Sequence, residues 1–191
     1  MQMGFIKNEN KCSTTIFVFS IQQMPPRFGS YNSIDDILEL TENDIRRKIP
    51  DYTSSGLTFD HIKRVRHPNY DKLDEFIDIP NARKYYIAAH GSKHANLINI
   101  ISNGFDKNKI KYLSCIHGTG FYLSDNIEKA TNYSKYILIC AINGGKIYRA
   151  RTKKSIVQVY NRCDTFYRDG IYVIKPEEGH RIFPLFIVTY R

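Results

Sequence analysis

The hydrophobic pattern of the first half of the chain predicts short strands and short helices rather than long elements. β-Branched and aromatic runs predict strands over residues 12–21 and 57–66. Capping-box spacings predict the starts of two short helices, at Ser33 with Asp36 and at Thr41 with Asp44. A third short helix is expected over residues 70–77.

In the second half, a buried strand over residues 85–89 is expected to end at His90-Gly91-Ser92. The following run predicts a helix that ends at Gly104, which is a natural C-cap. One face of this helix is predicted to carry its apolar residues, namely Ala95, Leu97, Ile98 and Ile101. A strand over residues 121–123 then leads into a helix that Asp125 and Glu128 are expected to cap and that reaches Tyr133.

The remainder of the chain is rich in strands, which we expect over residues 136–142, 146–150, 170–175 and 182–190. Asn143-Gly144-Gly145 predicts a hairpin between the first two of them. Short strands with a few small helices indicate an α+β fold on an antiparallel or mixed sheet. They exclude a doubly wound α/β domain, which needs more helices.

With 191 residues, the chain is expected to form one structural domain, in which residues 1–55 are an extension packed on a core of residues 56–191. Its 28 Lys and Arg against 19 Asp and Glu give a net charge of +9. This charge favours anionic partners, among them nucleotides and nucleic acid. A candidate basic stripe is formed by Arg149, Arg151, Lys153 and Lys154. No nucleic-acid recognition motif accompanies the stripe.

The four cysteines contain no C-x-x-C pair, which excludes a zinc ribbon or a thioredoxin motif and favours a reducing compartment. His90 and His94 lack a third ligand, so we expect no metal. No apolar run approaches the roughly 20 residues of a membrane span. We therefore expect a soluble intracellular monomer, cytoplasmic or nuclear, with no membrane partner.

Three local features carry candidate chemistry. They are the strand ending at His90-Gly91-Ser92, the run from Gly118 through Tyr122 toward Tyr133, and the strand at residues 170–174. Each feature alone fits an ordinary core. In this order and spacing they resemble the catalytic domain of the poly(ADP-ribose) polymerase (PARP) family, a branch of the diphtheria-toxin-like ADP-ribosyltransferases, over at least residues 57–191.

The resemblance implies an ADP-ribosyltransferase fold, with a split β core and short flanking helices, and NAD⁺ as co-substrate. It implies that His90 bonds a ribose hydroxyl, that the Gly91 backbone meets the carboxamide and that Ser92 adds a ribose contact. Tyr122 and Tyr133 would sandwich the cationic nicotinamide ring, which aromatic faces attract. Residues 106–118 match the donor loop over the nucleotide.

The resemblance also shows departures. Ile171 stands where polymerising members hold a glutamate, so that the triad here is His90, Tyr122 and Ile171. Because isoleucine cannot polarise a hydroxyl, this triad implies transfer of a single unit. Ala130 falls where many members have a serine that bonds the nicotinamide amide. Glu177 and Glu178 are expected in a turn, with Glu178 on the opposite strand face from Ile171.

These implications predict a mono-ADP-ribosyltransferase, a glycosyltransferase of the pentosyl class. It moves one ADP-ribose from NAD⁺ to a macromolecular acceptor, a protein in the first place, and releases nicotinamide. Two alternatives stay open at the level of the sequence. One is an inactive module that binds NAD⁺ or ADP-ribose. The other is a transferase that acts on nucleic-acid ends.

Overall fold

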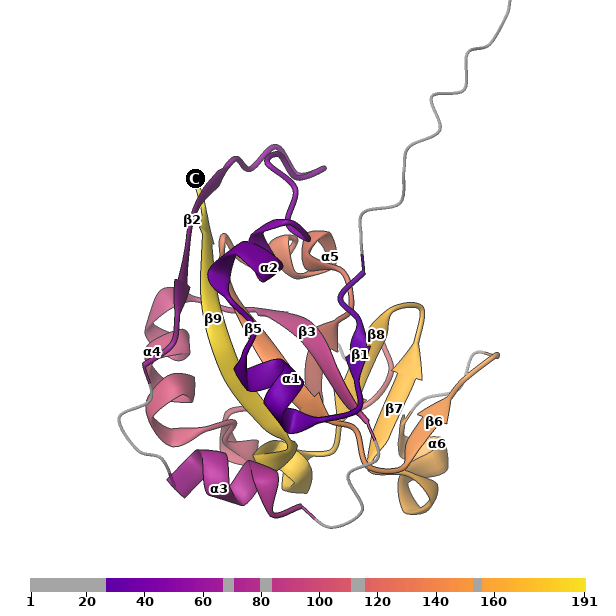
Figure 1. Ribbon diagram of the computed structural model, residues 1–191. Coiled ribbons are helices and arrows are strands. Elements are labelled where there is room, and N and C mark those ends of the chain that lie inside the picture. The colour runs from indigo at the N-terminus through magenta and orange to yellow at the C-terminus, as the bar shows by residue number, and fades with distance from the viewer. Residues whose placement is uncertain (1–26, 67–70, 80–83, 111–115, 153–155) are drawn as a thin grey trace, which may run out of the picture.

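The computed structural model describes residues 27–66, 71–79, 84–110, 116–152 and 156–191 (Figure 1). The strand predicted over residues 12–21 lies outside these residues. The strands are β1 (Ser30–Tyr31), β2 (Phe59–Arg64), β3 (Tyr85–Gly91), β4 (Phe121–Ser124), β5 (Tyr136–Asn143), β6 (Ile147–Arg149), β7 (Thr165–Arg168), β8 (Ile171–Ile174) and β9 (Ile182–Tyr190). The helices are α1 (Ile34–Leu38), α2 (Glu42–Arg46), α3 (Asp71–Ile77), α4 (His94–Asn103), α5 (Ile127–Thr131) and α6 (Ile156–Val159), with 3₁₀ turns η1 (Lys107–Lys109), η2 (Tyr160–Arg162) and η3 (Pro176–Arg181).

The strands form a sheet in the order β2-β9-β5-β3-β4-β8-β7-β6. The short strand β1 is not part of this order and pairs with β3. All described pairings are antiparallel except that of β6 with β7. Figure 1 shows β2 and β6 at opposite edges, with α1 and α2 over the strands nearer β2. The predicted α+β class with a mixed sheet is therefore confirmed.

The sheet splits between β3 and β4. Strand β3 pairs with β5 from Tyr85 to Gly91, whereas its described register with β4 is the single pair Ala89–Ser124. Helix α5 packs against β3, β4 and β5 at this point. The split leaves the end of β3 facing a short helix instead of a neighbouring strand, and this end carries the His-Gly motif.

Buried side chains fill both faces of the central strands. Strand β5 is buried from Ile137 to Asn143, as a strand covered on both faces requires. One apolar cluster joins Phe28, Ile37 and Ile45 to central-strand residues such as Ile139. The segment before residue 56 thus shares a core with the rest of the molecule, while the boundary at 55/56 stays a prediction.

The hairpin predicted at Asn143-Gly144-Gly145 is wrong. Both edges of β5 are already paired, with β3 on one side and β9 on the other, so β6 cannot join it. Strand β6 instead pairs in parallel with β7, a strand that the sequence pattern did not indicate. The turn itself forms, because the Asn143 side chain accepts a hydrogen bond from the Gly145 N–H at 3.3 Å.

Helix starts agree with the sequence in part. Thr41 and Asp44 form the predicted capping box, and Ser33 caps α1 through the N–H of Asp35. Asp125 does not cap α5, because the Asn126 side chain accepts from the Glu128 N–H at 2.9 Å. This helix ends at Thr131 and does not reach Tyr133.

Helix α4 begins at His94 and ends at the Gly104 cap as predicted. Its buried side is turned differently from the expected one. Leu97 is buried and Ile100 and Ile101 pack beside it, while Ile98 is 56% exposed. In the described part of the chain, no helix is both long and apolar enough to cross a membrane.

Candidate active site

Gly91 ends β3 at the split in the sheet. The Ser92 N–H donates to the Tyr136 carbonyl at 3.2 Å, which ties that residue to β5. Since successive residues of a strand turn their N–H groups to opposite edges, Gly91 turns its N–H toward the open side. A Cβ at Gly91 would lie 2.1 Å from the Ala130 carbonyl oxygen and 3.3 Å from Tyr133 Cβ. Glycine is therefore required here by close approach to the end of α5.

His90 joins β3 to β4 across the split. Its Nδ1–H donates to the Tyr122 backbone carbonyl at 2.9 Å. The edge of its ring also contacts Phe105, with centroids 5.2 Å apart. Burial lowers the pKa of His90, and the hydrogen bond to Tyr122 offsets this only partly. A neutral His90 thus fixes the position of the β4 backbone that carries Tyr122.

The Tyr122 side chain is held by the loop before β4. Its hydroxyl donates to the Gly118 carbonyl at 2.6 Å and accepts from the His117 N–H at 3.1 Å. These bonds fix the plane of the half-buried ring. Sequence reasoning did not single out His117, since its link to Tyr122 depends on how the loop closes.

Tyr133 lies beyond the end of α5 and is 77% exposed. Its N–H donates to the Ala130 carbonyl at 3.1 Å, so the backbone is anchored while the ring faces solvent. The structure thus brings Gly91, Ala130 and Tyr133 together and links His90 to Tyr122. That the two tyrosine rings sandwich one ligand stays a prediction.

Ser92 follows Gly91 and is partly exposed. Its hydroxyl accepts a hydrogen bond from the Asn96 side chain at 3.2 Å. Asn96 lies in the first turn of α4 and was not singled out from the sequence. The pair orients a hydroxyl beside the glycine, where a polar ligand group would meet it.

Ile171 lies on the same sheet face as Tyr122. It pairs directly with Ser124, which is two residues beyond Tyr122 in β4, and with Arg168 on the other side. Tyr122 and Ile171 also pack against one apolar cluster, formed by Ile156, Val159, Cys163, Phe166 and Val173. Ile171 therefore places an apolar side chain on the sheet face that also carries Tyr122.

Glu177 and Glu178 lie in η3, in line with the expected turn. Glu177 accepts from the Tyr160 hydroxyl at 2.5 Å, a bond that lowers its pKa. Glu178 pairs with Arg181 at 2.5 Å. The Glu177 contact joins η3 to η2, whereas the Glu178 contact lies within η3.

A cleft of about 520 Å³ is lined in part by Phe105, whose ring contacts His90. It is lined mainly by α4, η1 and η3, with Lys107 and Lys109 among its residues. Lys111, the third lysine of the predicted donor loop, lies outside the described residues. Within the described part of the chain, no group of three His, Cys, Asp or Glu side chains is arranged to hold a metal ion.

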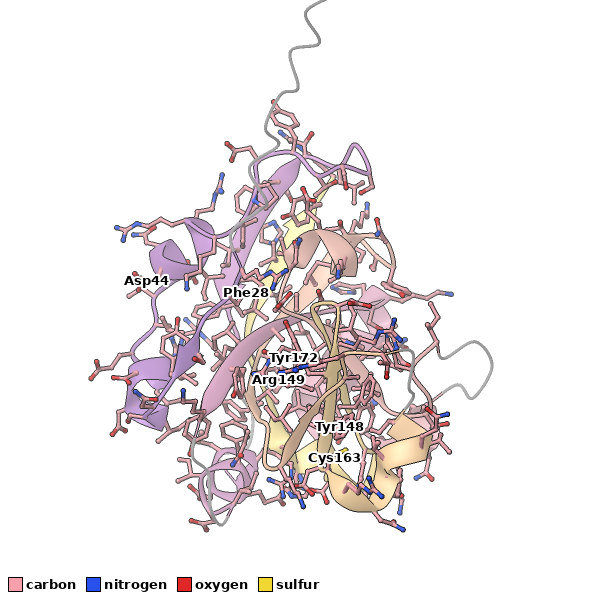
Figure 2. The ribbon with its side chains drawn as sticks, turned by 90° about the vertical axis from the view of Figure 1, so that its right-hand side faces the viewer. Phe28, Asp44, Tyr148, Arg149, Cys163 and Tyr172 are labelled. Atoms are coloured by element: carbon pink, nitrogen blue, oxygen red, sulfur yellow. The ribbon has the colours of Figure 1, made fainter. Side chains whose placement is uncertain are left out.

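Arg151 of the expected basic stripe is exposed, and so is Arg149. The Arg149 guanidinium lies 4.7 Å from the centroid of Tyr167 and 6.0 Å from that of Tyr86. Figure 2 shows Arg149 close to Tyr172, whose ring packs on Tyr167 at 4.7 Å. Lys153 and Lys154 lie outside the described residues. The exposed Arg149 thus also contacts aromatic rings, and the basic stripe stays a prediction.

The two histidines near Tyr122 predict how stability changes with pH. Burial lowers the pKa of both His90 and His117 from the ordinary value near 6.5. Below about pH 6.5 the unfolded chain takes up these protons first, so the free energy of unfolding falls as the pH drops toward the native pKa values. The slope reaches about 1.4 kcal/mol per pH unit for each histidine. Urea unfolding across this range measures it, and replacing His117 by Phe should reduce the slope. An unchanged slope would contradict the burial effect at His117.

Comparisons with known proteins point to one class. The model of the poly(ADP-ribose) polymerase catalytic domain matches residues 37–167. The poly [ADP-ribose] polymerase tankyrase of Caenorhabditis elegans is 31% identical over 86 residues, 40% of this chain and 4% of that protein. The crystal structure of the PARP domain of Arabidopsis RADICAL-INDUCED CELL DEATH1 matches with a TM-score of 0.65 at 18% identity, over 80% of this chain and 98% of that one.

A split mixed sheet with short helices, and a His-Gly motif at the split, define an ADP-ribosyltransferase domain. Because the family model covers more than half of the 191 residues, the chain belongs to the poly(ADP-ribose) polymerase catalytic domain family. Domains of this family use NAD⁺ as substrate. The chain spans only 4% of the tankyrase, so what that whole protein does is not carried over.

Proposed function

We propose that this chain transfers a single ADP-ribose unit from NAD⁺ to an acceptor, in the first place a protein, and releases nicotinamide. The observation that carries the proposal is the open end of β3. There the Gly91 backbone faces α5 at a distance that only glycine allows, beside a tyrosine that His90 and Gly118 hold in place. Membership of the family supplies the substrate class.

The residues at the split fit NAD⁺. A planar amide needs a backbone donor and acceptor that it can approach closely, and Gly91 has no side chain to prevent this. A pyridinium cation is attracted to aromatic faces, which Tyr122 and Tyr133 offer. Ser92 and His90 flank Gly91 and would bond ribose hydroxyls. These roles are proposals that the geometry supports.

Transfer needs the glycosidic bond between the ribose and nicotinamide to break while a bond to the acceptor forms. Nicotinamide leaves as a neutral molecule, and the acceptor's proton, where it has one, passes to solvent. The residues at the split contribute by holding the ring and the ribose in the reactive geometry. Ile171 cannot activate a ribose hydroxyl of an attached unit. A second unit is therefore not added, which is the reason to propose mono-ADP-ribosylation.

The test is release of nicotinamide from NAD⁺, quantified by chromatography with a protein mixture present as acceptor. We expect release by the unmodified chain and by His94→Ala, whose exposed side chain lies on α4. We expect a loss of release in Tyr122→Ala. Equal release by the Tyr122 variant and the unmodified chain would contradict the proposed site. The compartment and the oligomeric state stay predictions.

The loss of a serine at Ala130 gives a second testable result. Ala130 is 3% exposed and its carbonyl faces Gly91. Ala130→Ser supplies a hydroxyl for the carboxamide, worth about 1 kcal/mol, so nicotinamide should bind about fivefold more tightly. Calorimetric titration measures this, with Ala95→Ser on exposed α4 as the matched control. Unchanged or weaker binding in Ala130→Ser would place the carboxamide elsewhere.

A further inference from the structure

His117 is a nearly buried histidine that the proposed reaction does not use. It is 8% exposed and lies in the loop before Gly118. Its ring is nearly parallel to that of Tyr122, with an interplanar angle of 18° and centroids 6.5 Å apart. Phe166 of β7 packs on the His117 ring, with centroids 5.7 Å apart. The backbone carbonyl of His117 accepts a hydrogen bond from the Ile156 N–H of α6 at 2.6 Å. The loop and α6 thus hold this imidazole beside Tyr122.

The charge state of His117 is set by its surroundings. Its Nδ1 is buried and has no hydrogen-bond partner among the described residues, unlike Nδ1 of His90, which donates to a carbonyl. The charged groups that act on it are Arg168 of β7, Lys129 of α5 and Asp169 of the β7–β8 turn. Burial, followed by Arg168, lowers the pKa of His117, and Asp169 opposes them. The imidazole is therefore neutral at neutral pH.

A charge on His117 would change what Tyr122 can bind. An aromatic face attracts a cation because its π-electrons carry negative charge. If one side of the Tyr122 ring is covered by His117, a ligand ring stacks on the other side. A neutral imidazole leaves the attraction intact, whereas an imidazolium repels a second cation across the ring.

We propose that His117 is a positioning residue for the cationic nicotinamide ring, which Tyr122 binds more tightly while the imidazole behind it is neutral. This rests on the proposed function, because it takes Tyr122 as the stacking partner of NAD⁺. The ligand class that it selects against at low pH is a permanently charged pyridinium. An uncharged ring of the same shape is unaffected.

The size of the effect follows from the distance. A pyridinium stacked on Tyr122 would lie about 10 Å from His117, and at an effective dielectric constant of about 20 the repulsion weakens binding on the order of tenfold. Burial lowers the pKa of His90 as well. His90 is proposed to bond the ribose hydroxyls, which the charged and the neutral dinucleotide share, so its effect cancels in the ratio of their affinities.

The experiment compares two ligands that differ in one charge. Carba-NAD⁺ keeps the pyridinium and cannot release nicotinamide, while benzamide adenine dinucleotide has a neutral ring. Their dissociation constants are measured by calorimetry from about pH 7.5 down to the lowest pH at which the chain stays folded, because the pKa of His117 lies below the ordinary histidine value. For the unmodified chain, we expect carba-NAD⁺ to lose on the order of tenfold more affinity than the neutral dinucleotide.

The matched variants are His117→Phe, which keeps a ring beside Tyr122, and His117→Gln, which serves if the first does not fold. In both, the affinity ratio of the two ligands should not change with pH. The proposal for His117 alone is overturned if the affinity of carba-NAD⁺ relative to the neutral dinucleotide still falls with pH in the variants. It is also overturned if this relative affinity does not change with pH in the unmodified chain. If neither dinucleotide binds at about pH 7.5, the proposed function fails as well.

Discussion

Replacing His90 by alanine is expected to lower the rate of ADP-ribose transfer about 100-fold while the chain stays folded. The side chain donates to the Tyr122 carbonyl at 2.9 Å, at the place where β3 and β4 share one described residue pair. Its loss removes a proposed ribose contact and also loosens the strand that carries Tyr122. Displacements of about 1 Å at a reacting centre cost rates of this size.

The matched control is His94→Ala, which removes an exposed imidazole that contacts Tyr136 at 5.1 Å. Circular dichroism and thermal unfolding separate catalysis from folding. Loss of one hydrogen bond lowers the free energy of unfolding by about 1 kcal/mol, and the melting temperature by about 2–4 °C in a chain of this size. Transfer by His90→Ala within a few-fold of the unmodified rate would remove His90 from the site. A collapse of the melting temperature would mean that it acts through folding.

Replacing Gly91 by alanine is expected to abolish measurable binding of NAD⁺. The new Cβ would lie 2.1 Å from the Ala130 carbonyl oxygen, whereas real Cβ contacts stay beyond 3.0 Å. Either β3 or α5 must move, which separates the carboxamide position from Tyr133. Overpacking of this kind also costs about 1–3 kcal/mol of stability.

Gly29→Ala is the control, because a Cβ there would meet only the end of Lys48 at 4.0 Å. Titration with carba-NAD⁺ and a melting curve are measured for both variants. We expect at least a 100-fold weaker affinity in Gly91→Ala, a factor that corresponds to about 2.7 kcal/mol. In Gly29→Ala we expect an unchanged affinity. Unchanged affinity in Gly91→Ala would place the nicotinamide away from the end of β3.

The strands that carry the site were predictable because their hydrophobic runs are continuous. β5 is buried on both faces, and β3 and β9 are nearly so, which makes them stand out from the neighbouring loops. β7 and α6 have four residues each, and β7 has only two consecutive apolar residues, whereas the equally short β4 and β8 have three and four. The pairing of β6 was mispredicted because the local turn signal carries no information about the neighbours that β5 acquires from distant segments.

The same limit applies within the site. The sequence motifs identify His90, Gly91 and Tyr122, but not the bond by which His90 holds Tyr122. His117 was missed because its burial and its ring contact with Tyr122 depend on the conformation of the loop. Asp125 was expected to cap α5, and instead it accepts from the Tyr167 hydroxyl at 2.8 Å. Polar residues at element ends take the partner that packing supplies, which local spacing does not reveal.

The most direct test of single-unit transfer is the intact mass of the purified chain before and after incubation with NAD⁺ and a protein acceptor. We expect the chain or the acceptor to gain ADP-ribose as single units at separate sites, and neither to gain any with His90→Ala. Peptides that carry a ladder of repeated units would contradict the role given to Ile171. An unchanged mass, together with measurable binding of carba-NAD⁺, would contradict transfer and leave a module that binds NAD⁺ without consuming it.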